Sequence, residues 1–120
     1  MAANPLKNYL HVDKPWGAFD QYTLNEPSTV KILTIKSGGR TSLQSHTQRL
    51  EFWLAIDKGL IFTIEDQEIR PQVGEWVFVP LGARHRAAYE GSGQARYLEI
   101  SFGHFDEEDI TRYQDDYQRK

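Results

Sequence analysis

The amino-acid sequence predicts an all-β fold, and three observations support that prediction. Short runs rich in β-branched and aromatic residues recur along the chain, as they do in strands. Turn-forming clusters such as Ser37-Gly38-Gly39 and Gly91-Ser92-Gly93 separate these runs, at the spacing that an antiparallel sandwich or barrel requires. A helical pattern of apolar residues occurs only near the C-terminus.

The first expected element is an N-terminal arm. Residues 1–13 are mixed in character and contain Asn4-Pro5, so we expect them to be ordered only where they dock. A single domain over residues 14–120 follows, because Gly, Pro and charge are spread evenly through it. Its strands are expected, in order, at Val30–Lys36, Ser42–His46, Phe52–Ile56, Leu60–Ile64, Trp76–Val79, Arg86–Tyr89 and Arg96–Phe102.

The last expected element, from Asp106 to Lys120, is a helix. Ile110, Tyr113 and Tyr117 lie three and four residues apart, which is the spacing of one helix face. Acidic residues fill the first turn and basic residues close the last, as the helix dipole favours. We therefore expect a short C-terminal helix packed on a β-barrel.

Composition excludes several classes of protein. The 120 residues include 14 basic and 17 acidic ones, and the net charge of −3 leaves no basic stripe for nucleic acid. No apolar run is long enough to span a membrane and no secretory signal is visible, so we expect a cytoplasmic protein with no membrane partner. The sequence has no cysteine, which excludes disulfides and thiol nucleophiles.

Two separated segments together form a candidate metal site. The first is Gly38-x5-Gln44-x-His46-x4-Glu51 and the second is Gly74-x5-Pro80-x-Gly82-x2-His85. On a strand, Gln44 and His46 point to one face because side chains alternate, and a closed sheet would bring Glu51 and His85 alongside. Amide, carboxylate and imidazole groups suit a divalent ion such as Zn, Mn, Fe or Co, with positions left open for a substrate. Chance occurrence of the pattern is the alternative.

These segments resemble the paired motifs of the cupin superfamily, whose fold is a jelly-roll barrel, the double-stranded β-helix. The chain is most similar to the type II phosphomannose isomerase domain, which has Gln rather than His at the first ligand position, as here at Gln44. The likeness runs from Lys14-Pro15-Trp16-Gly17 to Asp109-Ile110-Thr111-Arg112 and beyond. It implies one divalent ion, Zn first and Mn, Fe, Co or Ni as alternatives, with the ligands Gln44, His46, Glu51 and His85.

The resemblance also implies an activity. It is that of a metal-dependent aldose–ketose isomerase acting on a small sugar phosphate, mannose 6-phosphate or fructose 6-phosphate, in a homodimer. Two alternatives stay open: a cupin that binds metal and sugars or sugar phosphates without turnover, and a cupin enzyme acting on another sugar. The chain departs from the family beside the ligands, at Thr47, Gln48, Phe52 and Gln118, so we expect an altered pocket wall.

Lys31 is the candidate proton carrier. It shares the parity of Leu33 and Ile35, which places it on the more apolar face of its strand. The alternative is an edge-strand lysine that reaches water, and we favour the inward orientation because the family has Lys at this position. A desolvated lysine beside a cation has a lowered pKa and suits general base catalysis.

Arg86, Arg112 and Arg119 are the candidate phosphate-binding residues, because a guanidinium fork matches phosphate oxygens. Arg86 follows a predicted ligand directly, although strand parity points it away from His85. Trp53 shares the parity of Glu51, so we expect it to wall the substrate pocket.

Overall fold

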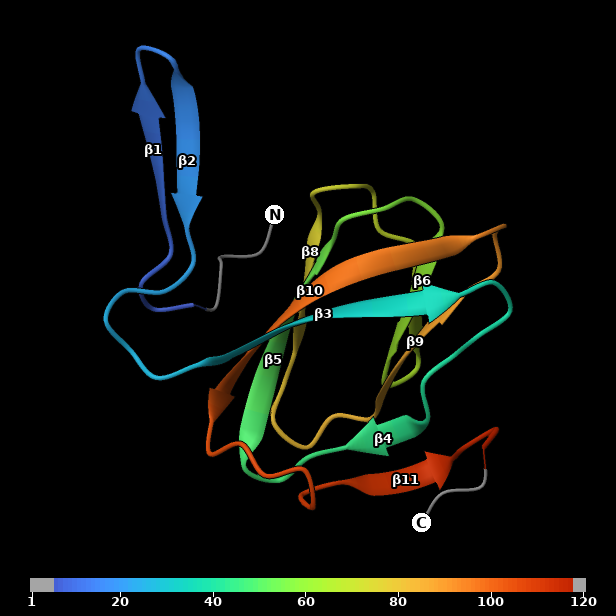
Figure 1. Ribbon diagram of the computed structural model, residues 1–120. Coiled ribbons are helices and arrows are strands. Elements are labelled where there is room, and N and C mark those ends of the chain that lie inside the picture. The colour runs from blue at the N-terminus through green and yellow to red at the C-terminus, as the bar shows by residue number, and fades with distance from the viewer. Residues whose placement is uncertain (1–5, 118–120) are drawn as a thin grey trace.

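The computed structural model describes residues 6–117 and consists of three antiparallel sheets (Figure 1). Among these residues no helix forms. The four-stranded sheet has the order β3-β10-β5-β8, the five-stranded sheet has the order β11-β4-β9-β6-β7, and β1 pairs with β2. The strands are β1 Leu10–Lys14, β2 Gly17–Gln21, β3 Thr29–Lys36, β4 Leu43–Ser45, β5 Arg49–Ala55, β6 Leu60–Ile64, β7 Gln67–Ile69, β8 Trp76–Val79, β9 His85–Tyr89, β10 Gln94–Gly103 and β11 Thr111–Gln114.

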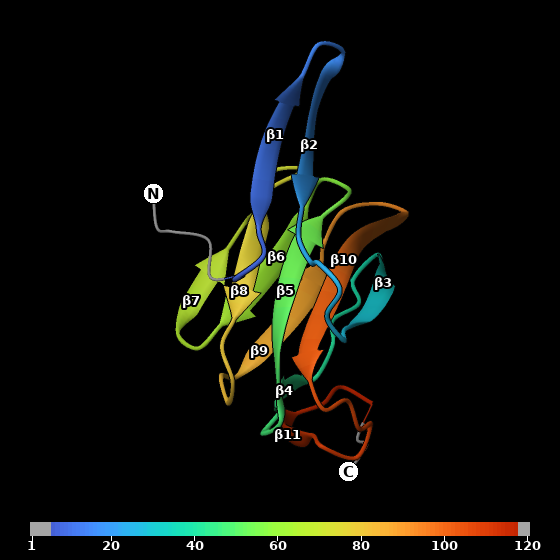
Figure 2. The same cartoon turned by 90° about the vertical axis from the view of Figure 1, so that its left-hand side faces the viewer.

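The all-β prediction is confirmed. The four- and five-stranded sheets face each other across a core, as Figures 1 and 2 show from two sides. Each expected run overlaps a strand, and Gly74 and Gly82 have the positive φ values, 86° and 78°, that their turns require. The structure also contains β1, β2, β7 and β11, which strand propensity does not indicate. Within the described residues, no helix has the length and apolar character that crossing a membrane requires.

Large aromatic side chains fill the core between the two sheets. Trp53 on β5, Phe62 on β6 and Tyr97 on β10 are each at most 1% exposed. Their ring centroids lie 4.9 to 5.1 Å apart in tilted and edge-on arrangements, which aromatic pairs prefer. This cluster closes one end of the barrel and leaves the other end to polar side chains.

The expected C-terminal helix is wrong for the described part of residues 106–120. Residues Thr111–Gln114 form β11, which pairs antiparallel with β4 and places Arg112 opposite Gln44. The edge of β4 offers unpaired backbone groups, and pairing with them satisfies the tail backbone better than a short isolated helix would. Tyr113, one of the residues whose spacing suggests a helix, instead contacts β4: its hydroxyl lies 2.9 Å from Ser45 Oγ. Arg119 and Lys120 lie outside the described residues.

The N-terminal region contains a β-hairpin. β1 and β2 pair along their full length from Leu10↔Gln21 to Lys14↔Gly17, across the expected boundary between arm and domain at residue 14. Before the hairpin, Leu6 packs on the outer face of the four-stranded sheet, against Phe52 and Ile100. Residues 1–5 of the expected arm lie outside the described residues.

Candidate metal centre

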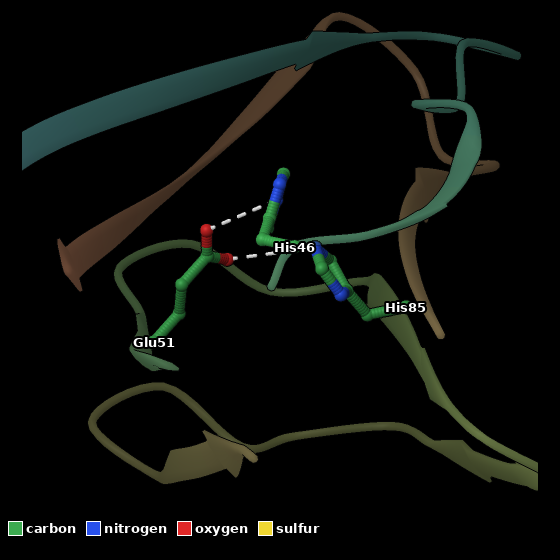
Figure 3. Close-up of side chains that lie close together, drawn as sticks. All are labelled: His46, Glu51 and His85. Carbon is green, nitrogen blue, oxygen red and sulfur yellow. Dashed lines mark ion pairs between the residues drawn. The ribbon is translucent and has the colours of Figure 1, made fainter. Parts of the chain in front are cut away.

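Three ionisable side chains from two separated segments of the sequence meet inside the barrel (Figure 3). His46 Nε2 lies 3.4 Å from Glu51 Oε2, and His85 Nε2 lies 3.6 Å from Glu51 Oε1. Each side chain is only 2% exposed, and one ligand atom from each lies within 4.8 Å of the others. The two imidazoles and the carboxylate could therefore hold one metal ion.

The sheets explain why these residues converge. Glu51 lies in β5, where it shares the inward face with Trp53 and Ala55. His85 begins β9, and its register partner on β4 is Gln44, with His46 just beyond the end of β4. The two sheets therefore bring Glu51 from one side and the histidines from the other.

Backbone carbonyls fix the orientation of both imidazoles. His46 Nδ1 lies 2.8 Å from the carbonyl oxygen of Asp109, and His85 Nδ1 lies 3.0 Å from that of Ala83. A carbonyl only accepts, so each Nδ1 carries the proton and each Nε2 presents its lone pair to the centre. Burial lowers the pKa of both histidines below its ordinary value, which keeps the rings neutral and able to ligate.

One buried nitrogen atom is suited to ligate a metal. Among the described residues, His85 Nε2 is fully buried and has no hydrogen-bond partner. A buried imidazole nitrogen without a partner costs desolvation free energy, of roughly 1–3 kcal/mol. A divalent ion at the centre would satisfy this lone pair, so the donor set fits a bound metal.

Gln44, the fourth predicted ligand, lies beside the three. Its Oε1 accepts a hydrogen bond from Ser42 Oγ at 2.6 Å, and its Nε2 lies 3.5 Å from His46 Nε2. In this arrangement the amide nitrogen of Gln44, and not its oxygen, points toward the centre. Ligation through oxygen would need the amide group turned over.

Two neighbours hold the Glu51 carboxylate in place. Trp53 Nε1 donates to Glu51 Oε1 at 3.0 Å, and Arg49 Nε donates to Glu51 Oε2 at 3.3 Å. Arg49 is itself buried, its Nη1 donates to the carbonyl of Asp106, and its Nη2 lies 3.3 Å from His46 Nε2. The guanidinium compensates the buried negative charge and orients the carboxylate toward the imidazoles.

Asp109 is a positioning residue that the sequence did not reveal. Its carboxylate accepts from Thr47 N at 3.0 Å, Thr47 Oγ1 at 2.7 Å and Gln48 N at 2.9 Å, and its carbonyl accepts from His46. Hydrogen bonds from Thr47 are the largest cause that holds the pKa of Asp109 down at about 2. The sequence predicts a helix for this segment, and a helix gives no reason to expect contact with residues 47–48.

The centre opens into a cavity of about 610 Å³. Lys31, Glu99, Arg112 and Tyr117 line it together with Gln44, Arg49, Glu51, Trp53 and His85. Glu99 is a second residue that the sequence analysis missed: it is 7% exposed, and its register partners are Lys31 on β3 and Trp53 on β5. Burial and then the Glu51 charge raise the pKa of Glu99 to about 8. The position of Glu99 on the inward face of β10, which strand alternation predicts, is the sequence signal that could have identified it.

The other sequence candidates divide into two groups. Lys31, Arg112 and Trp53 line the cavity. Arg86 is not among the lining residues: its guanidinium donates to the carbonyl of Thr41 and to Gln114, which ties β9 to the β11 side of the sheet. Arg119 lies outside the described residues.

Three of the departures from the family pattern, Thr47, Gln48 and Phe52, do not line the cavity. Phe52 faces outward and stacks on Trp76 at 5.1 Å between ring centroids, and Thr47 and Gln48 bond Asp109. For these three residues, the expectation of an altered pocket wall is therefore wrong. Gln118 lies outside the described residues.

Known proteins share the sequence pattern and the fold. The model of the family described as mannose-6-phosphate isomerase C-terminal matches residues 2–115. Xanthan biosynthesis protein XanB of Xanthomonas campestris pv. campestris (strain B100) is 32% identical over 109 residues, which are 90% of this chain and 23% of that protein. Alginate biosynthesis protein AlgA of Pseudomonas aeruginosa is 31% identical over 114 residues, which are 94% of this chain and 24% of that protein. The chain thus spans about a quarter of the length of these relatives.

A solved structure shows the same fold. An uncharacterised protein from Klebsiella pneumoniae with a double-stranded β-helix domain superposes with a TM-score of 0.62 at 13% identity, covering 71% of this chain and 73% of that one. The fold is therefore the double-stranded β-helix of cupins.

Proposed function

Because this chain belongs to the mannose-6-phosphate isomerase C-terminal family, we propose that it is a metal-dependent aldose–ketose isomerase that interconverts mannose 6-phosphate and fructose 6-phosphate. The observation that carries this proposal is the buried group of His46, Glu51 and His85 at the base of a polar cavity. A cavity of about 610 Å³ falls within the range of small-molecule sites, roughly 300–1,000 Å³.

His46, Glu51 and His85, with Gln44 beside them, would hold the ion. Zinc is the first candidate, and Mn, Fe, Co or Ni would also accept this set of nitrogen and oxygen donors. When bound, the ion supplies a Lewis acid that stabilises negative charge developing on a substrate oxygen. Trp53 and Arg49 keep the Glu51 carboxylate oriented, and the Asp109 carbonyl does the same for His46.

The reaction needs a group that carries a proton from C2 of the aldose to C1, while the carbonyl moves from C1 to C2. Lys31 is the proposed carrier. Its Nζ lies 3.0 Å from Glu107 Oε1 and 4.3 Å from the centroid of the Phe105 ring, at the cavity wall. Glu99 is its register partner on β10 and lines the same wall, which makes it the second group within reach of a bound sugar.

Arg112 is the proposed phosphate-binding residue, because it lines the cavity and lies opposite Gln44 in the β11–β4 pair. A guanidinium at this place would bind the phosphate through paired hydrogen bonds and hold the sugar carbons toward the centre. Arg86 has no part in this proposal, because its donors are engaged by Thr41 and Gln114.

The direct test is a coupled assay of fructose 6-phosphate formation from mannose 6-phosphate. We expect turnover with added metal and none after chelation. Lys31→Met should lower kcat by about 100-fold or more, the contribution typical of general acid–base catalysis. Lys58→Met is the matched control, since Lys58 is exposed in the turn between β5 and β6, and it should leave the rate unchanged.

One result would reject the isomerase, and another would reject only its assigned substrate. If calorimetry detects binding of mannose 6-phosphate to the metal-loaded protein while the assay stays silent, the chain is a metal-containing sugar phosphate binding module. If another sugar is isomerised and mannose 6-phosphate is not, the chemistry stands but the substrate assignment fails.

A further inference from the structure

The segment between β10 and β11, residues 104–110, contacts both the metal centre and the cavity wall. The carbonyl oxygen of Asp106 accepts a hydrogen bond from Arg49 Nη1 at 3.0 Å. The carboxylate of Glu107 accepts one from Lys31 Nζ, also at 3.0 Å. This connecting segment therefore holds a residue that orients a metal ligand and the proposed proton carrier.

A glycine sets the direction in which this segment leaves β10. Gly103, the last residue of β10, pairs with Arg49 on β5 and has a φ of 107°, which disfavours any residue with a Cβ. A Cβ at this position would collide with the carbonyl oxygen of Gln48. The chain therefore leaves β10 with its backbone directly against that of β5, and Phe105 follows two residues later.

The ring of Phe105 contacts two cations. Its centroid lies 4.2 Å from Arg49 Cζ and 4.3 Å from Lys31 Nζ. Both distances are well inside the separation of about 6 Å at which the negative face of an aromatic ring attracts a cation. The ring is thus a common contact of two side chains that come from different strands, β5 and β3.

The two cations differ in how firmly other groups hold them. Arg49 is 6% exposed, and it also bonds Glu51 and the carbonyl of Asp106. The Lys31 side chain is 38% exposed and its partner Glu107 is 77% exposed. Ion pairs this open to water contribute little and are screened by salt. Arg49 therefore fixes the ring, and the ring holds the Lys31 ammonium more firmly than Glu107 does.

We propose that Phe105 is a positioning residue that keeps the Lys31 ammonium at a fixed place on the cavity wall. The ring relates the position of Lys31 to that of Arg49, which bonds the metal ligand Glu51. A proton carrier works only within reach of the atom from which it takes the proton, so its placement affects kcat more than substrate affinity. The effect on kcat rests on the proposed isomerase activity, whereas the effect on Lys31 rests on these contacts alone.

The first test measures Lys31 itself and needs no turnover. Acetic anhydride acetylates lysine amines, and mass spectrometry of the peptides gives the rate at Lys31, with exposed Lys58 as the internal control. Reaction requires the amine to leave the ring. Phe105→Leu should therefore raise the rate at Lys31 by about threefold or more, the factor that corresponds to a cation–ring contact at a partly exposed site. Phe105→Tyr should react like the parent, and Glu107→Gln should have a smaller effect than Phe105→Leu.

The second test measures the reaction. Trifluorophenylalanine at position 105 keeps the shape of the ring but weakens the negative charge on its face, so kcat should fall by about threefold or more while KM stays the same. Phe105→Leu should lower kcat at least as much, and Phe105→Tyr should keep the parent value. Zinc affinity should stay at the parent level in every variant, because Glu51 and Asp106 still hold Arg49.

Four results would overturn the proposal. They are an unchanged acetylation rate at Lys31 in Phe105→Leu, a larger rate increase in Glu107→Gln, equal falls of kcat in Phe105→Leu and Phe105→Tyr, and a loss of zinc affinity in Phe105→Leu. The last two would mean that the ring supports the fold and does not position Lys31. A parent chain without turnover would reject the isomerase, and the acetylation rates would still decide whether Phe105 holds Lys31.

Discussion

Along β5, β9 and β10, the inward side chains at one end of the barrel are apolar and those at the other end are ionisable. On β9, His85 lies at the polar end and Ala87 and Tyr89 follow it toward the apolar end, and on β10 Tyr97 lies at the apolar end and Glu99 at the polar end. Trp53 joins the two ends. Its ring packs in the aromatic core while its Nε1 donates to the Glu51 carboxylate.

The two ends affect the free energy of unfolding in opposite directions. Burial of apolar area at the closed end stabilises the fold, by roughly 1.5–3 kcal/mol for each large side chain. At the polar end, burial of Glu51, Glu99 and the histidines has a desolvation cost that hydrogen bonds offset only in part. Variants at the closed end should therefore lower stability, and variants at the polar end should change binding.

The largest expected effect is at the closed end. Phe62→Ala should lower the free energy of unfolding by about 3–5 kcal/mol, because it opens a cavity beside Trp53 and Tyr97. Denaturant unfolding without metal measures this change. Leu81→Ala, at a position that is 57% exposed, is the control and should change stability little. A loss below about 1 kcal/mol for Phe62→Ala would mean that the ring cluster is not the stabilising core.

The next largest effect is at the polar end. His85→Ala should weaken zinc binding by more than about 100-fold, since loss of even an outer-shell partner weakens binding 10- to 100-fold. Without metal, the free energy of unfolding of this variant should stay closer to that of the parent than the value for Phe62→Ala does, because His85 Nε2 makes no hydrogen bond among the described residues that the variant would lose. Calorimetric titration with zinc measures the first quantity. His104→Ala, at an exposed position, should bind zinc like the parent; equal losses in the two histidine variants would argue against the site.

The smallest effect concerns the residue that joins the two ends. Trp53→Phe keeps an aromatic ring in the core but removes the Nε1 donor to Glu51, so zinc affinity should fall by about 10-fold. Trp76→Phe, on the outer face of the sheet where Trp76 stacks on Phe52, is the matched control. If both variants bind zinc equally well, the Trp53 hydrogen bond does not orient the carboxylate.

Much of the barrel was predictable because its strands carry strong local patterns. The run Leu60–Ile64 is almost wholly apolar and bounded by turn residues, and the structure has a strand with those limits. The convergence of His46, Glu51 and His85 was predictable from residue types and spacing together with family resemblance, since parity alone cannot bring two sheets together.

The C-terminal tail shows what local pattern could not predict. Its spacing of Ile110, Tyr113 and Tyr117 fits one face of a helix, yet the backbone pairs with β4 and Asp109 binds the 47–48 turn. Both contacts join residues more than 60 positions apart, and a window of local residues contains no information about such partners. Glu99 was missed for a related reason: its importance comes from its neighbours on β3 and β5.

The most direct test of the metal centre is anomalous diffraction at the zinc absorption edge from crystals soaked in zinc. We expect one strong peak between His46 Nε2, His85 Nε2 and the Glu51 carboxylate, about 2.0–2.2 Å from each ligand atom. Peaks only at surface groups, with His46, Glu51 and His85 left as they are without metal, would contradict the assignment of the barrel centre as a metal site.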